Sequence, residues 1–331
     1  MRQLMISLDK KILDSASAVA KRMIEYGKTD ELFILVPSFE KKEIQLSNTV
    51  QAFSTGGNKL QQLFRLKKMG LELIKKYEIK FVTVQDPSFI GNIGRWLKKK
   101  IGVTLEVQLH GDFYSSDYYK KSIKNRIGYF LFGKKNILAA DRVRVVSERV
   151  RKSLGDLGID ARKIYMKPVP TFDLGHLVTR QVRDLKNEYT TFVKRFLYVG
   201  RLEEVKNVEW LIDVFGEIVT QRGLNYGLLI LGEGSQLTKI REIIEKKNLS
   251  RNIICKGWAD ELQGYYSTAD CLLIPSLSES YSRVAMEAYA AGTPIIMNDV
   301  GVANHELKPS DKVKILPIND REKWIQAIIS I

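Results

Sequence analysis

Short apolar segments of strand length alternate with longer segments of helical periodicity along most of the 331-residue chain. In the second half, the segments 194–200, 226–232 and 271–276 each predict a buried strand, and each is followed by a polar turn and an apolar-periodic stretch. This alternation, which continues to about residue 317, is typical of βαβ units and predicts a parallel sheet. The carboxyl ends of such strands lie at one edge of the sheet, where open α/β sheets bind ligands.

The first half of the chain alternates in the same way. The expected elements, in chain order, are strand 2–8, helix 15–27, strand 32–38, helix 59–77, and strands 81–87, 104–111, 142–147 and 163–170. Two α/β halves of similar size suit this chain length, which is long for one domain. We expect one domain over 1–170 and a second over 171–331, joined by a polar linker near 168–192.

Two glutamates eight positions apart flank the start of a predicted helix in the second half. Glu279 follows the strand 271–276, and Glu287 lies about a turn and a half into a helix that ends near Gly292. Between them, the backbone N–H groups of residues 281–284 point out of the helix N-terminus, where an anion binds favourably. The spacing by itself is weak evidence, because such pairs are commonly solvated surface charges.

Two cations follow the strand 194–200. Arg201 comes directly after it, and Lys206 lies near the start of the next helix. Arginine offers a planar fork, and lysine a compact charge, to phosphate oxygens. Both lie at the carboxyl end of a strand, where open α/β sheets bind ligands, but either residue alone is better explained as a solvated surface cation.

The segment SLSESYSRVAMEAYAAGTPII, taken together with VGRLEEVK, resembles the E-x7-E signature of the family-4 retaining glycosyltransferases (glycosyl transferases group 1). The resemblance is clearest over roughly 194–306 and diffuse over 80–170. It implies an α/β protein with a GT-B fold, in which two Rossmann-like domains with parallel sheets face each other across a cleft. The first domain would bind the acceptor and the second the nucleotide sugar.

The resemblance also implies roles for individual residues. Glu279 is expected to contact the donor sugar, Glu287 to hold the nucleotide ribose, and Arg201 and Lys206 to clamp the diphosphate. Further donor-site residues expected from the family are Gly200, Gly232, Glu233, Gly257, Trp258, Ser282, Arg283 and Val284. The Gly232 loop serves equally well as an ordinary turn, and a tryptophan that follows a turn is commonly packed.

In the first half, His110 follows a predicted strand and is one of only three histidines. The family often has a catalytic histidine here that reaches the donor sugar, and a histidine that caps the strand is the alternative. Asp112 is expected either to contact the acceptor or to cap a helix. Two features depart from the family: no glycine precedes Gly27, although the early loop is usually glycine-rich, and the hinge at 170–173 reads PTFD.

Positive charge is concentrated in the first half. Residues 1–170 carry 33 Lys and Arg against 17 Asp and Glu, whereas the remainder carries 20 against 21. Segment 117–138 mixes aromatic, apolar and basic residues like an interfacial amphipathic helix, so we expect contact with an anionic membrane surface. A solvated lysine-rich face is the alternative. No nucleic-acid partner is expected, because no RNA-binding or helix-turn-helix signature is evident.

The location of the protein is inferred from what the sequence lacks. No segment is long and apolar enough to span a bilayer, and the start MRQLMISLDKK does not resemble a signal peptide. Cys255 and Cys271 have no metal-ligand spacing and are expected to be buried thiols in a reducing compartment. We therefore expect a cytoplasmic protein, peripheral on the inner face of the membrane. The chain stops where many relatives continue, so a short member and a truncated sequence both remain open.

These features predict an enzyme that moves a sugar from a UDP- or GDP-sugar to a glycan or lipid-linked acceptor in surface polysaccharide or glycoconjugate synthesis. No cofactor and no metal are expected, because no Asp-x-Asp pair follows a strand and the two cations replace Mg²⁺. A non-catalytic nucleotide-sugar-binding subunit and a nucleotide-sugar epimerase of the same fold are the alternatives. The combination of the two glutamates with the two cations argues against the epimerase.

Overall fold

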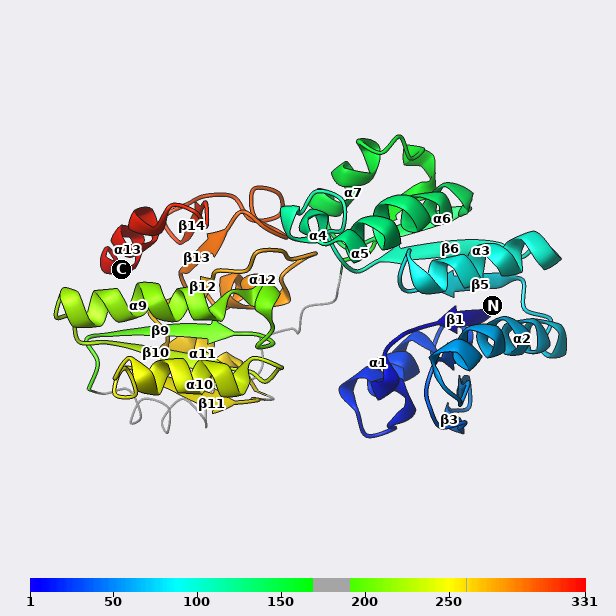
Figure 1. Ribbon diagram of the computed structural model, residues 1–331, viewed down its shortest axis with the longest axis horizontal. Coiled ribbons are helices and arrows are strands. Elements are labelled where there is room, and N and C mark those ends of the chain that lie inside the picture. Colours follow the sequence, from blue (N-terminus) through cyan, green and yellow to red (C-terminus); the bar gives the residue numbers. More distant parts are fainter. Residues whose placement is uncertain (169–190, 260) are drawn as a thin grey trace. The chain divides into compact units, whose positions relative to one another are not determined.

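The computed structural model describes residues 1–168, 191–259 and 261–331, and these fold into two compact α/β units (Figure 1). Unit 1 comprises Met1–Val146 and Val150–Lys167. Unit 2 comprises Ser147–Arg149 and Pro168–Ile331. Most of the expected linker near 168–192, including the hinge sequence at 170–173, lies outside the described residues.

Unit 1 contains an eight-stranded sheet with the order β3-β4-β2-β1-β5-β6-β7-β8. Its strands are β1 (Arg2–Ile6), β2 (Glu31–Val36), β3 (Glu43–Ser47), β4 (Val50–Ser54), β5 (Phe81–Val84), β6 (Thr104–Leu109), β7 (Arg142–Val145) and β8 (Ile164–Met166). Neighbouring strands are parallel except β3 and β4, which form an antiparallel hairpin at the edge. This hairpin was not predicted from the sequence, because β3 is a short edge strand with only Ile44 and Leu46 as apolar residues.

Helices cover both faces of this sheet. Those within residues 1–168 are α1 (Ala18–Tyr26), α2 (Lys59–Lys76), α3 (Phe89–Ile101), α4 (Asp117–Lys121), α5 (Ile123–Asn125), the π-helical segment Arg126–Gly133, α6 (Lys134–Ala139) and α7 (Glu148–Gly155), with 3₁₀ turns at Lys10–Leu13 and Ala161–Lys163. Leu66 of α2 and Leu97 of α3 share a core with Val107 of β6. Met23 of α1 packs with Ile34 and Val50 in a separate core.

The composition of segment 117–138 suggests an amphipathic helix, but the segment is not one continuous helix. Ser122 has an extended backbone (φ −89°, ψ 126°) and separates α4 from α5. The following turns are π-helical before α6 begins at Lys134. A periodicity read at 3.6 residues per turn does not detect such changes, because π-helical turns contain more residues.

Unit 2 contains a six-stranded parallel sheet with the order β11-β10-β9-β12-β13-β14. Its strands are β9 (Lys194–Val199), β10 (Tyr226–Leu231), β11 (Ile253–Gly257), β12 (Cys271–Ile274), β13 (Ile295–Asn298) and β14 (Val313–Leu316). Its helices within 191–259 and 261–331 are the 3₁₀ turn Glu204–Lys206, α9 (Val208–Gln221), α10 (Leu237–Lys246), α11 (Gln263–Thr268), α12 (Arg283–Ala290) and α13 (Arg321–Ile329). These elements match the strand–helix alternation expected from the sequence.

The core of unit 2 lies between the sheet and its helices. Helices α9 and α10 lie side by side along β9 and β10 (Figure 1). Phe215 of α9, Ile244 of α10 and Trp324 of α13 are buried in one core. Every residue of β10 is buried, because a parallel sheet is covered on both faces.

No helix among the described residues combines the length and apolarity needed to cross a membrane. The two cysteines are free thiols in strands, as expected. Cys271 is buried, whereas Cys255 is only partly buried because β11 is an edge strand. The expectation of full burial was therefore wrong for Cys255.

Candidate active site

The strand order of unit 2 reverses between β9 and β12. These strands are neighbours in the sheet, although β10 and β11 separate them in sequence. Ligands bind at such a switch point, at the carboxyl ends of the strands, because the connections on its two sides leave in opposite directions. The loop after β9 carries Arg201 and Lys206, and the loop after β12 carries Glu279. The topology therefore brings three of the expected residues to one edge.

Lys206 and Glu279 meet across the switch point. Nζ of Lys206 lies 2.6 Å from Oε1 of Glu279, and the side chains are only 15% and 11% exposed. The Ser276 hydroxyl donates to the same oxygen at 2.8 Å. The two loops are also joined through their backbones, since the amide of Leu277 donates to the carbonyl of Val205 at 2.8 Å. These contacts fix the cation and the carboxylate in place.

Glu287 is held in the interior of the site. Helix α12 begins at Arg283, which places Glu287 on its second turn as expected. The Glu287 carboxylate, 6% exposed, accepts hydrogen bonds at 3.0 Å from both the Tyr266 hydroxyl and the Arg283 guanidinium. Burial, and then the Glu287 charge, raises the pKa of Tyr266, so the phenol remains a neutral donor. The sequence did not indicate Tyr266, because only tertiary packing brings α11 to α12.

The start of α12 has the features of an anion site. Ser282 precedes the helix in the left-handed region (φ +73°, ψ 75°), which is unusual for a residue other than glycine. It is 6% exposed, and no group among the described residues hydrogen-bonds its hydroxyl. A strained backbone and a buried hydroxyl that has no protein partner within this part of the chain are typical of ligand sites. Arg283 and Val284 follow in the first turn of the helix, whose amides have no acceptor within the helix itself.

Arg201 is exposed directly after β9, and the described residues offer it no ion pair. Its carbonyl accepts a hydrogen bond from the Tyr198 hydroxyl at 3.1 Å. Burial, and then the nearby Glu279 charge, raises the pKa of Tyr198, while the Arg201 charge opposes this. Arg201 and Glu279 therefore lie near the same phenol, and the guanidinium is available to an anion there.

The glycine loops after β9 and β10 pack against each other. A Cβ atom on Gly232 (φ +150°) would lie 1.8 Å from the carbonyl oxygen of Gly200. A Cβ atom on Gly234 would lie 2.4 Å from the carbonyl oxygen of Leu202, whose amide donates to the Glu233 carbonyl at 2.8 Å. Loop packing therefore requires these glycines. The sequence left open whether the loop is an ordinary turn or contacts the donor, and packing alone accounts for the glycines.

The loop after β11 contacts the glycine loop after β10. The amide of Gly232 donates to the Gly257 carbonyl at 2.7 Å. Trp258 follows and is 63% exposed, so its indole is not packed into the core. The side chain of Glu233 is also exposed. Contacts of Glu233 and Trp258 with a donor stay predictions.

A further loop supports Glu279 and was not anticipated. Gly301 follows β13 with φ +58°, and a Cβ atom there would lie 2.9 Å from the Cβ of Glu279 and 2.7 Å from the Tyr281 carbonyl oxygen. The Asn298 side-chain amide donates to the Ser276 carbonyl at 2.8 Å. The Asp-Val-Gly turn after the strand was the available signal, but nothing in it indicates which loop it contacts.

In unit 1, His110 directly follows β6, and its Nε2 lies 2.9 Å from Oε1 of Gln108. Although the residue reaches solvent, the protein atoms around the ring, followed by the charges of Arg144 and Arg22, lower the pKa of His110 to about 4. Asp112 is buried and accepts hydrogen bonds from the amide and hydroxyl of Ser115. Asp112 therefore caps a turn before α4, whose own N-cap is Ser116, so the expected role as a helix cap was wrong. Acceptor contact by Asp112 and donor contact by His110 remain predictions.

Residues 193–331 match the family described as glycosyl transferases group 1. This match lies within unit 2 and covers less than half of the chain. The whole chain superimposes on sucrose-phosphate synthase from Thermosynechococcus elongatus with a TM-score of 0.79 at 18% identity, covering 100% of this chain and 90% of that one. HepE of Anabaena, in complex with UDP and glucose, gives a TM-score of 0.74 at 14% identity over 100% and 89%. The fold is therefore GT-B.

Two curated relatives differ in how much of them the chain spans. The uncharacterized glycosyltransferase MJ1607 of Methanocaldococcus jannaschii is 32% identical over 34% of this chain, which spans only 30% of that protein. The uncharacterized 41.2 kDa protein in the cps region of Klebsiella pneumoniae is 26% identical over 89% of this chain and 80% of its own length.

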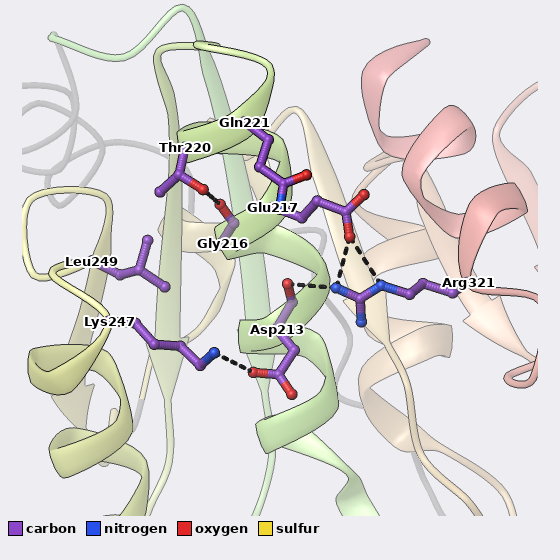
Figure 2. Close-up of a pocket in the computed structure, with 8 residues that line it drawn as sticks. All are labelled: Asp213, Gly216, Glu217, Thr220, Gln221, Lys247, Leu249 and Arg321. Carbon is purple, nitrogen blue, oxygen red and sulfur yellow. Dashed lines mark hydrogen bonds and ion pairs between the residues drawn. The ribbon is translucent and has the colours of Figure 1, made fainter.

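Unit 2 also has a hollow of about 460 Å³ away from the switch point. It lies between α9, the residues after α10 and the start of α13 (Figure 2). Arg321 pairs with Glu217 at 2.9 Å, and Lys247 pairs with Asp213 at 3.3 Å. Because its charged walls neutralise each other and the expected residues lie elsewhere, this hollow is not the candidate active site. No group of three or more His, Cys, Asp or Glu side chains within the described ranges is arranged to hold a metal.

Proposed function

We propose that the protein transfers a sugar from a UDP- or GDP-sugar to a glycan or lipid-linked acceptor with retention of anomeric configuration. The observation that carries the proposal is the buried Lys206–Glu279 pair at the switch point between β9 and β12. The N-terminus of α12, where anions bind favourably, follows in the same loop and adds a site for a diphosphate. The likeness to HepE, whose structure contains UDP and glucose, supports a nucleotide sugar as the ligand.

Each residue then has a defined task. Breaking the anomeric C–O bond leaves negative charge on the departing diphosphate, and Arg201, Lys206 and the first amides of α12 stabilise that charge. Glu279 orients the sugar hydroxyls, and Glu287 accepts hydrogen bonds from the ribose hydroxyls. The leaving phosphate takes the proton of the acceptor hydroxyl. The two cations provide the charge that Mg²⁺ supplies elsewhere, so we propose that neither metal nor cofactor takes part.

Thermal denaturation with UDP-, GDP- and ADP-sugars tests the site. At a ligand concentration 100 times Kd, binding contributes about 2.7 kcal/mol. For a unit of this size, that raises Tm by roughly 5–10 °C. The Glu287→Gln variant is expected to lose about 10- to 100-fold in affinity, because a charged hydrogen-bond acceptor is removed.

The matched control is Glu245→Gln on α10, which replaces an exposed glutamate. It should bind like the unmodified protein. If no nucleotide sugar raises Tm, the proposed function is wrong. A non-catalytic subunit is distinguished by product: it would show the Tm shift but release no nucleoside diphosphate in the presence of an acceptor. Retention is checked by NMR of the product's anomeric proton.

We also propose that the acceptor lies at an anionic membrane surface that unit 1 contacts. Ile123, Ile127 and Leu131 are 74%, 49% and 48% exposed and recur every four residues. With Arg126 and Phe130 they line a groove of about 370 Å³. Basic residues flank them at Lys120, Lys121, Lys124, Lys134 and Lys135. Exposed apolar side chains ringed by cations favour an anionic lipid surface, to which each cation contributes about 1 kcal/mol.

Ile127→Asp is expected to reduce binding to vesicles containing phosphatidylserine at least 10-fold, because it places a charge of the wrong sign among the apolar side chains. Val193→Asp, at a 70% exposed position in unit 2, is the control and should bind like the unmodified protein. Co-sedimentation with anionic and neutral vesicles measures the effect. Equal binding to both vesicle types, or salt-sensitive retention on RNA instead, would contradict the proposal.

A further inference from the structure

One face of the unit 1 sheet carries a buried row of polar side chains that leads to His110. Glu106 and Gln108 alternate along β6, so they point to the same face, and His110 continues the row. Thr83 of β5 pairs in register with Glu106. Thr83, Glu106 and Gln108 are at most 5% exposed. Polar groups buried this deeply in a sheet require hydrogen-bond partners.

These side chains form a continuous hydrogen-bonded chain. The Tyr165 hydroxyl donates to Oε2 of Glu106 at 2.6 Å, and the Thr83 hydroxyl donates to Oε1 at 3.1 Å. The side-chain amide of Gln108 donates to Oε1 of Glu106 at 3.0 Å and to the Thr83 hydroxyl at 2.9 Å. Oε1 of Gln108 then lies 2.9 Å from Nε2 of His110.

The carboxylate of Glu106 gives this chain its direction. An ionised carboxylate only accepts hydrogen bonds, so the NH₂ group of Gln108 must face Glu106. The carbonyl oxygen of Gln108 therefore faces His110 and can only accept. Reversing the amide would place two acceptors against each other in the buried row, which is unfavourable. The ring nitrogen Nε2 of His110 must then carry a proton.

We propose that Glu106 and Gln108 are positioning residues that hold His110 as its Nε2–H tautomer. In that form Nδ1 has a lone pair that can accept a hydrogen bond from a substrate hydroxyl. This role rests on the proposed function. Within the described residues, Nδ1 has no hydrogen-bond partner of its own.

The charges around the ring favour the same neutral form. Arg144 is paired in register with Gln108 and is 6% exposed, and Arg22 lies on α1. The protein atoms around the ring, and then the charges of these two arginines, lower the pKa of His110. Because the folded protein binds this proton less readily than the unfolded chain, His110 lowers stability as the pH falls from about 6.5 towards 4. At neutral pH it is an acceptor and not an acid.

The tautomer is measured directly by long-range ¹H–¹⁵N NMR on histidine-labelled protein, which is practical because the chain has three histidines. His110→Gln identifies the signal. The unmodified protein should show Nε2 protonated and Nδ1 unprotonated at pH 7, without any substrate. Gln108→Leu should give a mixture of tautomers. A protonated Nδ1 in the unmodified protein overturns the proposal even if no variant folds.

Activity provides the second readout. Gln108→Leu should lower kcat about 10- to 100-fold with KM within about twofold, by analogy with the loss of a partner that orients a metal-binding histidine. Gln51→Leu is the matched control. Like Gln108, Gln51 donates to a glutamate (Glu43), and it accepts from the Tyr77 hydroxyl. It lies on β4, near the opposite edge of the sheet from β6. It should leave the tautomer and kcat unchanged.

A double exchange separates positioning from packing. Glu106→Gln combined with Gln108→Glu keeps an acceptor opposite Nε2 and should preserve the tautomer while raising the pKa of His110, since a carboxylate now adjoins the ring. If Gln108→Leu retains the tautomer and kcat of the unmodified protein, the proposal is overturned. Failure of the proposed function is recognised separately, as the loss of any Tm shift with nucleotide sugars while the tautomer remains as stated.

Discussion

Replacing Lys206 with alanine is expected to lower kcat for sugar transfer about 10²- to 10³-fold, because it removes one fixed positive group from the leaving diphosphate. The lysine is held 2.6 Å from Glu279 at 15% exposure, so no mobile surface cation replaces it. The variant also leaves the Glu279 carboxylate, 11% exposed, with Ser276 as its remaining side-chain partner. Breaking a buried pair in this way costs about 3–5 kcal/mol when burial is complete, and somewhat less here.

A double variant distinguishes lost stability from lost catalysis. Lys206→Ala with Glu279→Gln removes the unpaired charge, so Tm should recover while kcat stays low. Lys239→Ala is the control, because Lys239 pairs with Glu209 at the surface with side chains 59% and 37% exposed. Such pairs contribute under about 1 kcal/mol. If the double variant regains both Tm and kcat, Lys206 has a structural role and not a catalytic one.

Replacing Gly232 with alanine is expected to have the largest effect on stability. The new Cβ would lie 1.8 Å from the backbone carbonyl of Gly200, and neither backbone can yield without moving its strand. Overpacking and backbone strain together should cost about 3–5 kcal/mol. For a unit of this size the cost corresponds to a fall in Tm of roughly 10 °C, measured by circular dichroism.

Gly223→Ala is the matched control for this effect. Gly223 also has a positive φ of 65°, but a Cβ atom there meets nothing within 4 Å. It should therefore cost only the intrinsic penalty of about 1 kcal/mol. Equal Tm values for the two variants would mean that the loops after β9 and β10 are not packed against each other in solution. Nucleotide-sugar binding should fall with Gly232→Ala and not with Gly223→Ala.

Much of unit 2 could be predicted from the sequence because its strands are buried on both faces. Segments such as 226–232 are continuously apolar and stand out from their polar turns. In unit 1, the sequence pattern did not predict elements at the edge of the sheet or places where the helix type changes. The hairpin β3–β4 lies at an edge, and the segment 117–138 breaks at Ser122 and continues as a π-helix.

The candidate site shows the same division. The resemblance to the family-4 glycosyltransferases, and not motif spacing alone, pointed to Glu279, Glu287, Arg201 and Lys206. It could not identify Tyr266, Ser276 or Gly301, which hold those residues in place, because serine, tyrosine and glycine have no distinctive pattern and their partners are distant in sequence. Gln108 was similarly overlooked, since a buried glutamine in a strand signals nothing until its neighbours are known.

The sequence by itself determined the alternation of strands and helices, the concentration of positive charge in residues 1–170, and the chemical types that follow each strand. These properties are local, because apolar periodicity and turn residues act over a few positions. Only the tertiary structure decided that β12 lies beside β9, and hence that Glu279 reaches Lys206 from 73 positions away. Strand order depends on packing over the whole sheet, and no short segment contains that information.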